Sequence, residues 1–475
     1  MGALVLYLIT AWFSVGYHGE DEHHQVIGFA EYRMGDLPEH ERAWEYEARI
    51  RATGLPWVAM GIFSTADVLG VSSPFTKAFL LRVLTALIAL LAITGFIRAV
   101  LPSVPDVLQK GFILLSYFLW FLPFLMVRFS SETWSGLLFM MGLTAALRTD
   151  RSRWWAVHAG LLMALSIWVR VPMVFAVLGF VGWLWRVQNE PRSIFLEFTG
   201  AALALMLLTI GIDSLFYGIP TCSAWRYFSM AVQGDPGHVF DTLPWYYYAP
   251  WIVKYCVPPI GICILLAFLK LAFKHPRHLL VWIIVPFVVV HTFIPHKELR
   301  FLYPLAFCVP WILIAGYREW SSIFENRSVR VIGIAGLGVL VLFNLMALFV
   351  VGSSPAGNGR VALAKKLHEL KPGPETEITY IIGGIDSWRV RLPHFYLPDG
   401  LVQTSFDRSR IDTTFHVTKY VVAHEADAAL INENANVDLE LITTTETALN
   451  EQLLQWYSWG ERPSRWGLYM VNGDE

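Results

Sequence analysis

The sequence predicts an α-helical polytopic membrane protein with about eleven transmembrane helices and a small C-terminal α/β domain outside the membrane. Hydrophobic residues fill 55% of the 475 positions and charged residues only 16%, which is typical of a chain that crosses the bilayer many times. Apolar runs follow one another along residues 1–352, and the pattern changes after residue 353. We therefore expect a membrane domain over 1–352 and a separate domain over 353–475.

The apolar runs are separated by short polar segments. Several are shorter than the ~20 residues that a perpendicular transmembrane helix needs, and such spans are tolerated where they line a cavity. The eleven runs are 2–17, 78–101, 109–127, 133–147, 154–169, 171–187, 194–217, 249–270, 279–294, 301–317 and 330–352.

Basic residues indicate how the spans are oriented. Four loops, which contain Arg148, Arg186, Lys270 and Arg318, all fall on one face when they are counted through the proposed spans. The positive-inside rule makes that face cytoplasmic. Four other segments then share the opposite face with the C-terminal domain: 18–77, 128–132, 213–248 and 295–300.

The C-terminal part reads as a small domain behind a linker. Residues 352–359 are rich in Gly and Ser, which favours a flexible connection. A helix is predicted over 361–370, followed by four β-rich runs at 377–382, 419–423, 437–443 and 467–471.

Two global features narrow the choice of partners. The net charge of −2 argues against a nucleic-acid-binding protein. The four cysteines show neither metal-ligand spacing nor a disulfide framework.

Three consecutive acids open the first outer segment, in His18-Gly-Glu-Asp-Glu-His-His-Gln25. A carboxylate at the membrane face, partly shielded from water, can act as a general base on a hydroxyl. The same acids could simply be solvated. A third interpretation is a divalent metal held with His18, His23 and His24, although the spacing matches no defined site.

A charged and aromatic stretch follows at Trp44-Glu-Tyr-Glu47. Glu45 and Glu47 stand four residues before Arg49 and Arg51, so we expect two i,i+4 ion pairs on a helix. Such a helix suits the membrane interface or a solvated surface.

The segment Pro295-His-Lys-Glu-Leu-Arg-Phe301 lies between two long apolar runs. Ionisable groups at the mouth of a membrane are costly and usually functional. Several cations in so few residues suit an anionic headgroup, Arg through its bidentate fork and Lys as a point charge. The alternative is a plain loop whose charges fix the helix ends.

Together these stretches resemble the membrane mannosyltransferases that elongate lipid-linked oligosaccharides and the glycan of GPI anchors, glycosyltransferase family 22. The resemblance covers roughly residues 1–320. Its matching pieces are Asp21-Glu22 with Gln25, Trp44-Glu-Tyr with Ile50-Arg51, Arg128 with Ser131-Glu132, Asp213-Ser with Phe216-Tyr-Gly, Trp225 with Phe228, Pro244-Trp-Tyr-Tyr, and His296-Lys-Glu-Leu-Arg-Phe301.

The sequence departs from the family pattern at two places. The family usually has His-Pro directly before Asp-Glu, whereas here His18 is followed by Gly-Glu, with one extra residue. Ser131-Glu132 replaces the usual Ser-Asn.

The resemblance implies a GT-C fold and the transfer of a hexose, with mannose expected, from a polyprenyl- or dolichyl-phosphate sugar to a lipid-linked glycan. It implies inversion, from a β-linked donor to an α-linked product, without metal or cofactor. The expected location is a bacterial inner membrane or an ER membrane, with the active site on the periplasmic or luminal face.

The resemblance also assigns roles to residues. Asp21 is the expected base and Glu22 the second choice. His296, Lys297 and Arg300 are expected to bind the donor phosphate. Six residues are expected to support the site, with Glu298 orienting the cations: Glu298, Arg128, Glu132, Trp44, Glu45 and Trp245.

Two other functions compete with this interpretation. A transporter or flippase of a lipid-linked solute also has many spans and intramembrane charges, but the charged motifs gather on one face and no inverted repeat is visible. A GT-C enzyme for another sugar, such as glucose or aminoarabinose, or for a protein acceptor is the nearer rival.

Overall fold

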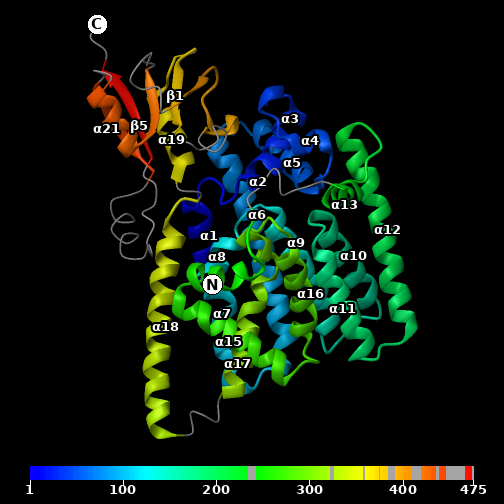
Figure 1. Cartoon of the computed structure of the whole chain (residues 1–475). Helices are drawn as coiled ribbons and strands as arrows, with labels where there is room; N and C mark the ends of the chain where they lie inside the picture. Colours follow the sequence, from blue (N-terminus) through cyan, green and yellow to red (C-terminus); the bar gives the residue numbers. More distant parts are fainter. Residues whose placement is uncertain are drawn as a thin grey trace.

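The computed structural model describes residues 1–233, 242–320, 326–356, 359–373, 375–382, 391–407, 419–434, 438–445 and 466–472. Val437, the first residue of one predicted strand, lies outside these residues, as do parts of the segments 213–248, 318–330 and 352–359. A large helical body carries a small sheet at one end (Figure 1).

All eleven apolar runs fall on helices, and three of the runs are divided between two helices. The elements are α1 (Gly2–Phe13), α6 (Pro74–Val100), α7 (Asp106–Phe118) with α8 (Phe121–Leu125), α9 (Ser131–Leu147), α10 (Trp155–Val169), α11 (Met173–Arg186), α12 (Arg192–Tyr217), α14 (Tyr248–Tyr255) with α15 (Pro258–Lys274), α16 (Leu279–Phe293), the 3-10 helix η6 (Leu299–Cys308) with α17 (Val309–Trp320), and α18 (Arg327–Ser353).

Fewer than eleven of these helices meet the length and composition expected of a membrane span. In the described residues four are long and apolar enough to cross a bilayer: Pro74–Ser103, Arg192–Tyr217, Leu299–Glu319 and Arg327–Ser353. A fifth is possible if α15 and α16, which meet at 114°, count as one span. The expected number of eleven is therefore not confirmed. The shorter apolar helices α1, α10 and α11 pack against neighbouring helices, and short helices of this kind are tolerated inside a bundle.

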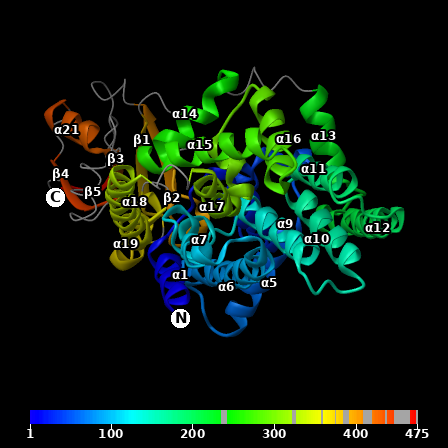
Figure 2. The same ribbon diagram turned by 90° about the horizontal axis from the view of Figure 1, so that it is seen from below.

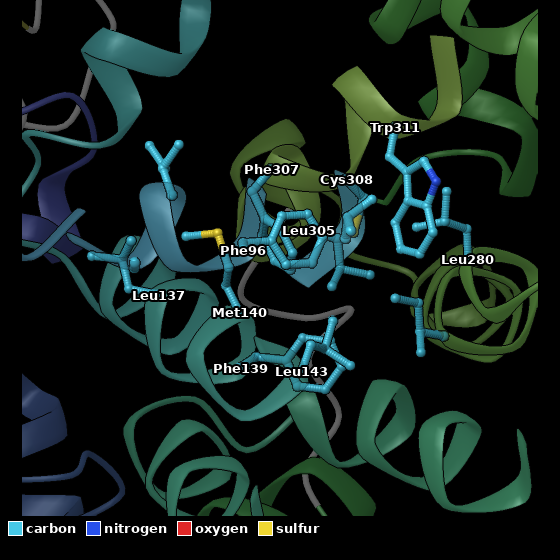
Figure 3. Packing of buried hydrophobic residues seen from close by; sticks show 14 of the residues in the cluster. Phe96, Leu137, Phe139, Met140, Leu143, Leu280, Leu305, Phe307, Cys308 and Trp311 are labelled. Atoms are coloured by element: carbon cyan, nitrogen blue, oxygen red, sulfur yellow. The ribbon is translucent and has the colours of Figure 1, made fainter. Parts of the chain in front are cut away.

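The two longest outer helices mark the edges of the body. α12 and α18 lie at opposite sides in both views (Figures 1 and 2). Between them a continuous apolar core joins α6, α9, α16, η6 and α17 (Figure 3). At its centre the Phe96 and Phe307 rings meet edge to face, 5.2 Å apart. Helices approach closely where glycine removes the side chain: a Cβ on Gly179 of α11 would lie 1.9 Å from the Trp282 carbonyl oxygen of α16.

Short helices build the rest of the outer end. They are α2 (Glu20–Glu22), the π-helix η1 (His23–Ile27), α3 (Gly28–Met34), η2 (Glu39–Glu41), α4 (Trp44–Ala48), α5 (Gly54–Val68), α13 (Ser223–Gln233) and η5 (Trp245–Tyr247). The α2 to α5 group lies beside the sheet (Figure 1).

The two ion pairs expected on the helix that begins at Trp44 are wrong. Helix α4 ends at Ala48 because Arg49 adopts a left-handed backbone conformation, with φ 55°. Glu47 instead contacts Arg42 at 2.7 Å. Arg51 turns back toward Glu45, 3.8 Å away. The break thus redirects Arg51 into the molecule.

We call residues 360–472 the C-terminal α/β region. It contains α19 (Arg360–Leu370), β1 (Glu377–Ile382), η9 (His394–Tyr396), β2 (Val402–Asp407), β3 (Tyr420–His424), α21 (Glu425–Asn434), β4 (Asp438–Thr444) and β5 (Trp466–Asn472). The strand order is β2-β1-β3-β5-β4, with β1 parallel to β2 and β3, and β5 antiparallel to β3 and β4. The predicted α/β character is confirmed, whereas β2 and α21 were not predicted.

The two faces of the sheet pack against different parts of the chain. One apolar cluster, which includes Ile381 and Tyr469, contains Ala428 and Ile431 of α21. The cluster on α19 also includes Tyr17 and Ala78 from the membrane part. The C-terminal α/β region therefore shares a core with the ends of the two apolar runs that flank the first outer segment.

Candidate functional site

Charged side chains that are far apart in the sequence meet at the outer end of the body. Asp21 Oδ2 lies 3.0 Å from Arg300 Nη1 and 3.8 Å from Arg51 Nη2. Arg300 Nη2 donates to Glu298 Oε1 at 2.8 Å, and His296 Nε2 lies 2.9 Å from the same oxygen. We call these five residues the Asp21–Arg300 cluster. It confirms that the first outer segment lies beside residues 295–300.

The acids of α2 are held by three arginines. The short helix, followed directly by a π-helix, turns successive side chains in different directions, and π-helical turns often occur at functional sites. The three pairs are Glu20 with Arg360 at 2.8 Å, Asp21 with Arg300 at 3.0 Å, and Glu22 with Arg128 at 3.3 Å. None of the three acids is merely solvated.

Asp21 differs from its neighbours in having one open oxygen. Both arginines contact Oδ2, and within the described residues Oδ1 makes no hydrogen bond or ion pair. The side chain is 27% exposed. A carboxylate oxygen that is open in this way is able to accept a proton from a hydroxyl.

Glu22 faces the interior instead. It is 9% exposed, contacts Arg128 and accepts a hydrogen bond from the His18 backbone N–H at 2.9 Å. Burial raises the pKa of Glu22, and the charge of Arg128 opposes that rise. Arg128 also donates to the carbonyl oxygens of Ser14 at 2.8 Å and Gly16 at 3.2 Å. These contacts tie the chain after α1 to the body and indicate a structural role for the pair.

Arg128→Ala is expected to lower the free energy of unfolding by about 3–5 kcal/mol, because it leaves Glu22 buried without its cation. Chemical denaturation of the purified protein in detergent measures this loss. Arg148→Ala is the matched control, since Arg148 is 55% exposed and its ion pair among the described residues is with nearby Asp150. Equal stability of both variants would contradict the assignment.

Lys297 is a buried cation beside the cluster in sequence. It is 3% exposed, and its Nζ donates to the carbonyl oxygens of Leu243 at 2.9 Å and Ile294 at 2.6 Å. Within the described residues no carboxylate contacts it. Lys297 therefore ties the segment before η5 to the end of α16 while its charge stays unneutralised.

A cavity of about 40 Å³ lies beside the Asp21–Arg300 cluster. Arg51 lines the cavity and is also a member of the cluster. Polar and aromatic side chains line it together with Arg51, among them Gln25, Ser131, Trp168, Arg170, Ser223 and Tyr227. The other half of the lining is apolar, so the cavity combines hydrogen-bonding groups and two aromatic rings with an aliphatic wall.

Arg170 belongs to this cavity, and the sequence did not assign it to the site. It caps α10 in an extended conformation and contacts Glu132 Oε1 at 2.8 Å. A signal was present, since Arg170 stands alone between two apolar runs and before Pro172. Glu132, at the start of α9, is buried with it.

Asp213 holds the wall of the cavity together. Its carboxylate accepts hydrogen bonds from the backbone N–H and hydroxyl of Thr53, from Trp168 Nε1 and from the Ser223 hydroxyl. Asp213 is 1% exposed and contacts no cation in the described residues. It thereby fixes the first outer segment to α10 and α13.

The other expected support residues lie in different surroundings. Glu45 accepts a hydrogen bond from Gln25 Nε2 at 2.8 Å and faces Arg51, so it joins the edge of the cluster. Trp44 and Trp245 are 51% and 68% exposed. Neither ring touches the cluster among the described residues, and both suit the membrane interface.

The three histidines near the acids have separate partners. The His18 ring lies 3.0 Å from the Tyr303 hydroxyl, and His24 lies 3.4 Å from Glu20. His23 is buried against the rings of Tyr17 and Tyr396. In the described part of the chain no three His, Cys, Asp or Glu residues are grouped to hold a metal.

The fold is that of the GT-C membrane glycosyltransferases. The structure is similar to ArnT from Cupriavidus metallidurans bound to undecaprenyl phosphate, with a TM-score of 0.56 and 12% identity, covering 100% of this chain and 97% of that one. The apo state of the same protein gives a TM-score of 0.54 and 11% identity, covering 99% and 96%.

The chain belongs to the Alg9-like mannosyltransferase family, whose model matches residues 3–383. Similar proteins include GPI alpha-1,2-mannosyltransferase 3 of Danio rerio, 24% identical over 317 residues, and of Mus musculus, 24% identical over 316. The matches cover 65% of this chain and 56% and 55% of those proteins. The chain thus spans about half the length of the curated relatives that it matches.

Proposed function

We propose that the protein is an inverting membrane mannosyltransferase that moves mannose from a polyprenyl- or dolichyl-phosphate sugar to a hydroxyl of a lipid-linked glycan. The observation that carries the proposal is the open oxygen of Asp21 beside Arg300. Membership of the Alg9-like family supports mannose as the sugar. The likeness to a protein crystallised with undecaprenyl phosphate supports a polyprenyl-phosphate donor.

The proposed reaction is a single displacement. The acceptor hydroxyl gives its proton to Asp21 Oδ1 while its oxygen bonds to the anomeric carbon of the donor. The bond from that carbon to the phosphate oxygen breaks, and its electron pair leaves on the phosphate. Attack from the face opposite the leaving group turns a β-linked donor into an α-linked product.

Cations close to Asp21 in the same site stabilise the departing phosphate. Lys297 carries a charge that no carboxylate neutralises in the described residues. Arg300 presents a guanidinium whose position is fixed by its hydrogen bond to Glu298. Groups aimed at developing negative charge usually contribute most to catalysis. His296 contacts the same Glu298 oxygen as Arg300 Nη2. The cavity lined by Arg51 and Arg170 is the proposed place of a sugar ring.

The proposed location follows from the positive loops and the position of the site. All members of the Asp21–Arg300 cluster come from segments opposite the basic loops. We therefore place the site on the periplasmic face of a bacterial inner membrane or the luminal face of the ER, where membrane lipid delivers the donor.

A transfer assay tests the function. The purified protein in nanodiscs is given polyprenyl-phosphate mannose, glucose or aminoarabinose together with mannosylated lipid acceptors. Transfer of mannose alone is the expected result. Transfer of another sugar would keep the enzyme class and overturn the substrate, whereas movement of lipid across the bilayer without transfer would identify a flippase.

A further inference from the structure

We propose that Arg360 is a positioning residue for sugar transfer: from the C-terminal α/β region it holds Glu20, and through Glu20 it sets the direction of the Asp21 carboxylate. The inference rests on the proposed function, because it takes Asp21 as the base. It gives the C-terminal α/β region a part in the active site.

Asp21 lies in the first turn of a longer helical stretch. α2 runs directly into the π-helix η1 and then into α3, so residues 20–34 are helical throughout, and the N-cap residue Gly19 offers no side-chain hydrogen bond. The first N–H groups of a helix have no partner within the helix, and helix ends fray. Contacts with other parts of the chain therefore help to fix the direction of the α2 side chains.

Glu20 is held firmly at one carboxylate oxygen, while the other lies near an imidazole ring. Arg360 Nη2 donates to Oε1 at 2.8 Å, and His24 Nε2 lies 3.4 Å from Oε2. The side chains of Arg360 and Glu20 are 13% and 23% exposed, so water screens the pair only partly. Burial alone would raise the pKa of Glu20, but the nearby His24 ring and the charge of Arg360 lower it overall.

The backbone just before α2 docks on the start of α19. The Ala356 N–H donates to the Val15 carbonyl oxygen at 2.9 Å. Gly16 has φ +89°, and a Cβ there would lie 3.2 Å from the Val361 side chain. Val361 directly follows Arg360. The two chain segments therefore meet closely enough for Arg360 to keep a fixed distance from Glu20.

Glu20 and Asp21 are adjacent, so a shift of one carries the other. Arg300 and Arg51 hold only Oδ2 of Asp21. Without Arg360 the first turn loses a tie at its N-terminal end and can shift about that contact, which would move Oδ1 away from the acceptor. Misplacement of a reacting group by about 1 Å can cost ~10²-fold in rate.

Steady-state transfer by the full-length protein in nanodiscs tests the inference, with kcat and the KM for polyprenyl-phosphate mannose measured separately. Arg360→Gln and Glu20→Gln are each expected to lower kcat by about 10–10²-fold with an unchanged donor KM. Because both act through one contact, the double variant should fall no further than either single variant. Arg360→Lys should recover part of kcat, as should Arg360→Glu combined with Glu20→Arg.

Arg391→Gln is the matched control in the same region. Arg391 donates to the Ser405 hydroxyl at 2.9 Å, away from α2, and this variant should keep the wild-type kcat. Thermal unfolding is measured for every variant, and kcat is expressed per folded molecule.

The inference is overturned if Arg360→Gln keeps the wild-type kcat, if the two single losses multiply in the double variant, or if neither Arg360→Lys nor the reversed pair recovers activity. In each case wild-type transfer leaves the proposed function standing. A wild-type protein that transfers no sugar would overturn both.

Discussion

Asp21→Asn is expected to lower the rate of sugar transfer by about 10²–10⁴-fold, the usual contribution of a general base. Asparagine keeps the size of the side chain and can still lie beside Arg300, but it cannot take a proton from the acceptor. Donor binding should change little, since Oδ1 faces the acceptor in this account. Single-turnover transfer from polyprenyl-phosphate mannose measures the chemical step, and donor binding is measured separately.

Two variants sharpen this result. Glu39→Gln changes an acid of the same outer segment that is 80% exposed and lies outside the cluster, so it should transfer at the wild-type rate. Glu22→Gln should lose stability through its pair with Arg128 rather than lose the chemical step. If Glu22→Gln loses transfer while Asp21→Asn keeps it, the base has been assigned to the wrong member of the pair.

Arg300→Ala is expected to lower kcat by about 10²–10³-fold, the cost of losing one group that stabilises developing charge. The substitution also frees Asp21 and Glu298, which Arg300 holds on two sides. Steady-state kinetics with saturating acceptor measures the loss.

Arg42→Ala serves as the control for Arg300, because Arg42 pairs with Glu47 on the outer segment and away from the cluster. Arg300→Lys should retain part of the activity, since it keeps the charge but not the fork. Wild-type turnover by Arg300→Ala would remove Arg300 from the mechanism.

The sequence predicted on which face of the membrane each loop lies better than it predicted which side chains touch. Alternating the loops through the apolar runs placed Asp21 on the same face as Arg300, 279 residues away, and the structure joins them at 3.0 Å. Which acid faces the site was out of reach, because a one-residue shift in a turn of three acids exchanges their directions. In the structure Glu20 faces Arg360, Asp21 faces Arg300 and Glu22 faces Arg128.

Local backbone geometry accounts for the wrong ion pairs. Arg49 ends α4 in a left-handed conformation that is uncommon for any residue except glycine. The i,i+4 spacing of charges therefore continues in the sequence past Ala48, although the helix ends there. Strand β2 was missed for a related reason: Val402–Asp407 is an edge strand with little buried surface, so its sequence lacks a strong apolar alternation.

Neither the number of membrane spans nor the contact of Arg360 with Glu20 could be predicted from the sequence without the folded structure. An apolar run shows that a segment avoids water, but a helix such as α10 avoids water by packing between α9 and α12. Arg360 and Glu20 are 340 residues apart. A lone arginine after a glycine-rich linker carries no pattern that points to its partner.

The central claim is that Asp21 acts as the base of a single displacement, and the anomeric configuration of the product tests it most directly. Purified protein is given β-linked polyprenyl-phosphate mannose and a mannosylated lipid acceptor, and the new linkage is determined by NMR. The account predicts an α-linked mannose. A β-linked product would contradict it, since retention requires two displacements and a nucleophile in place of a base.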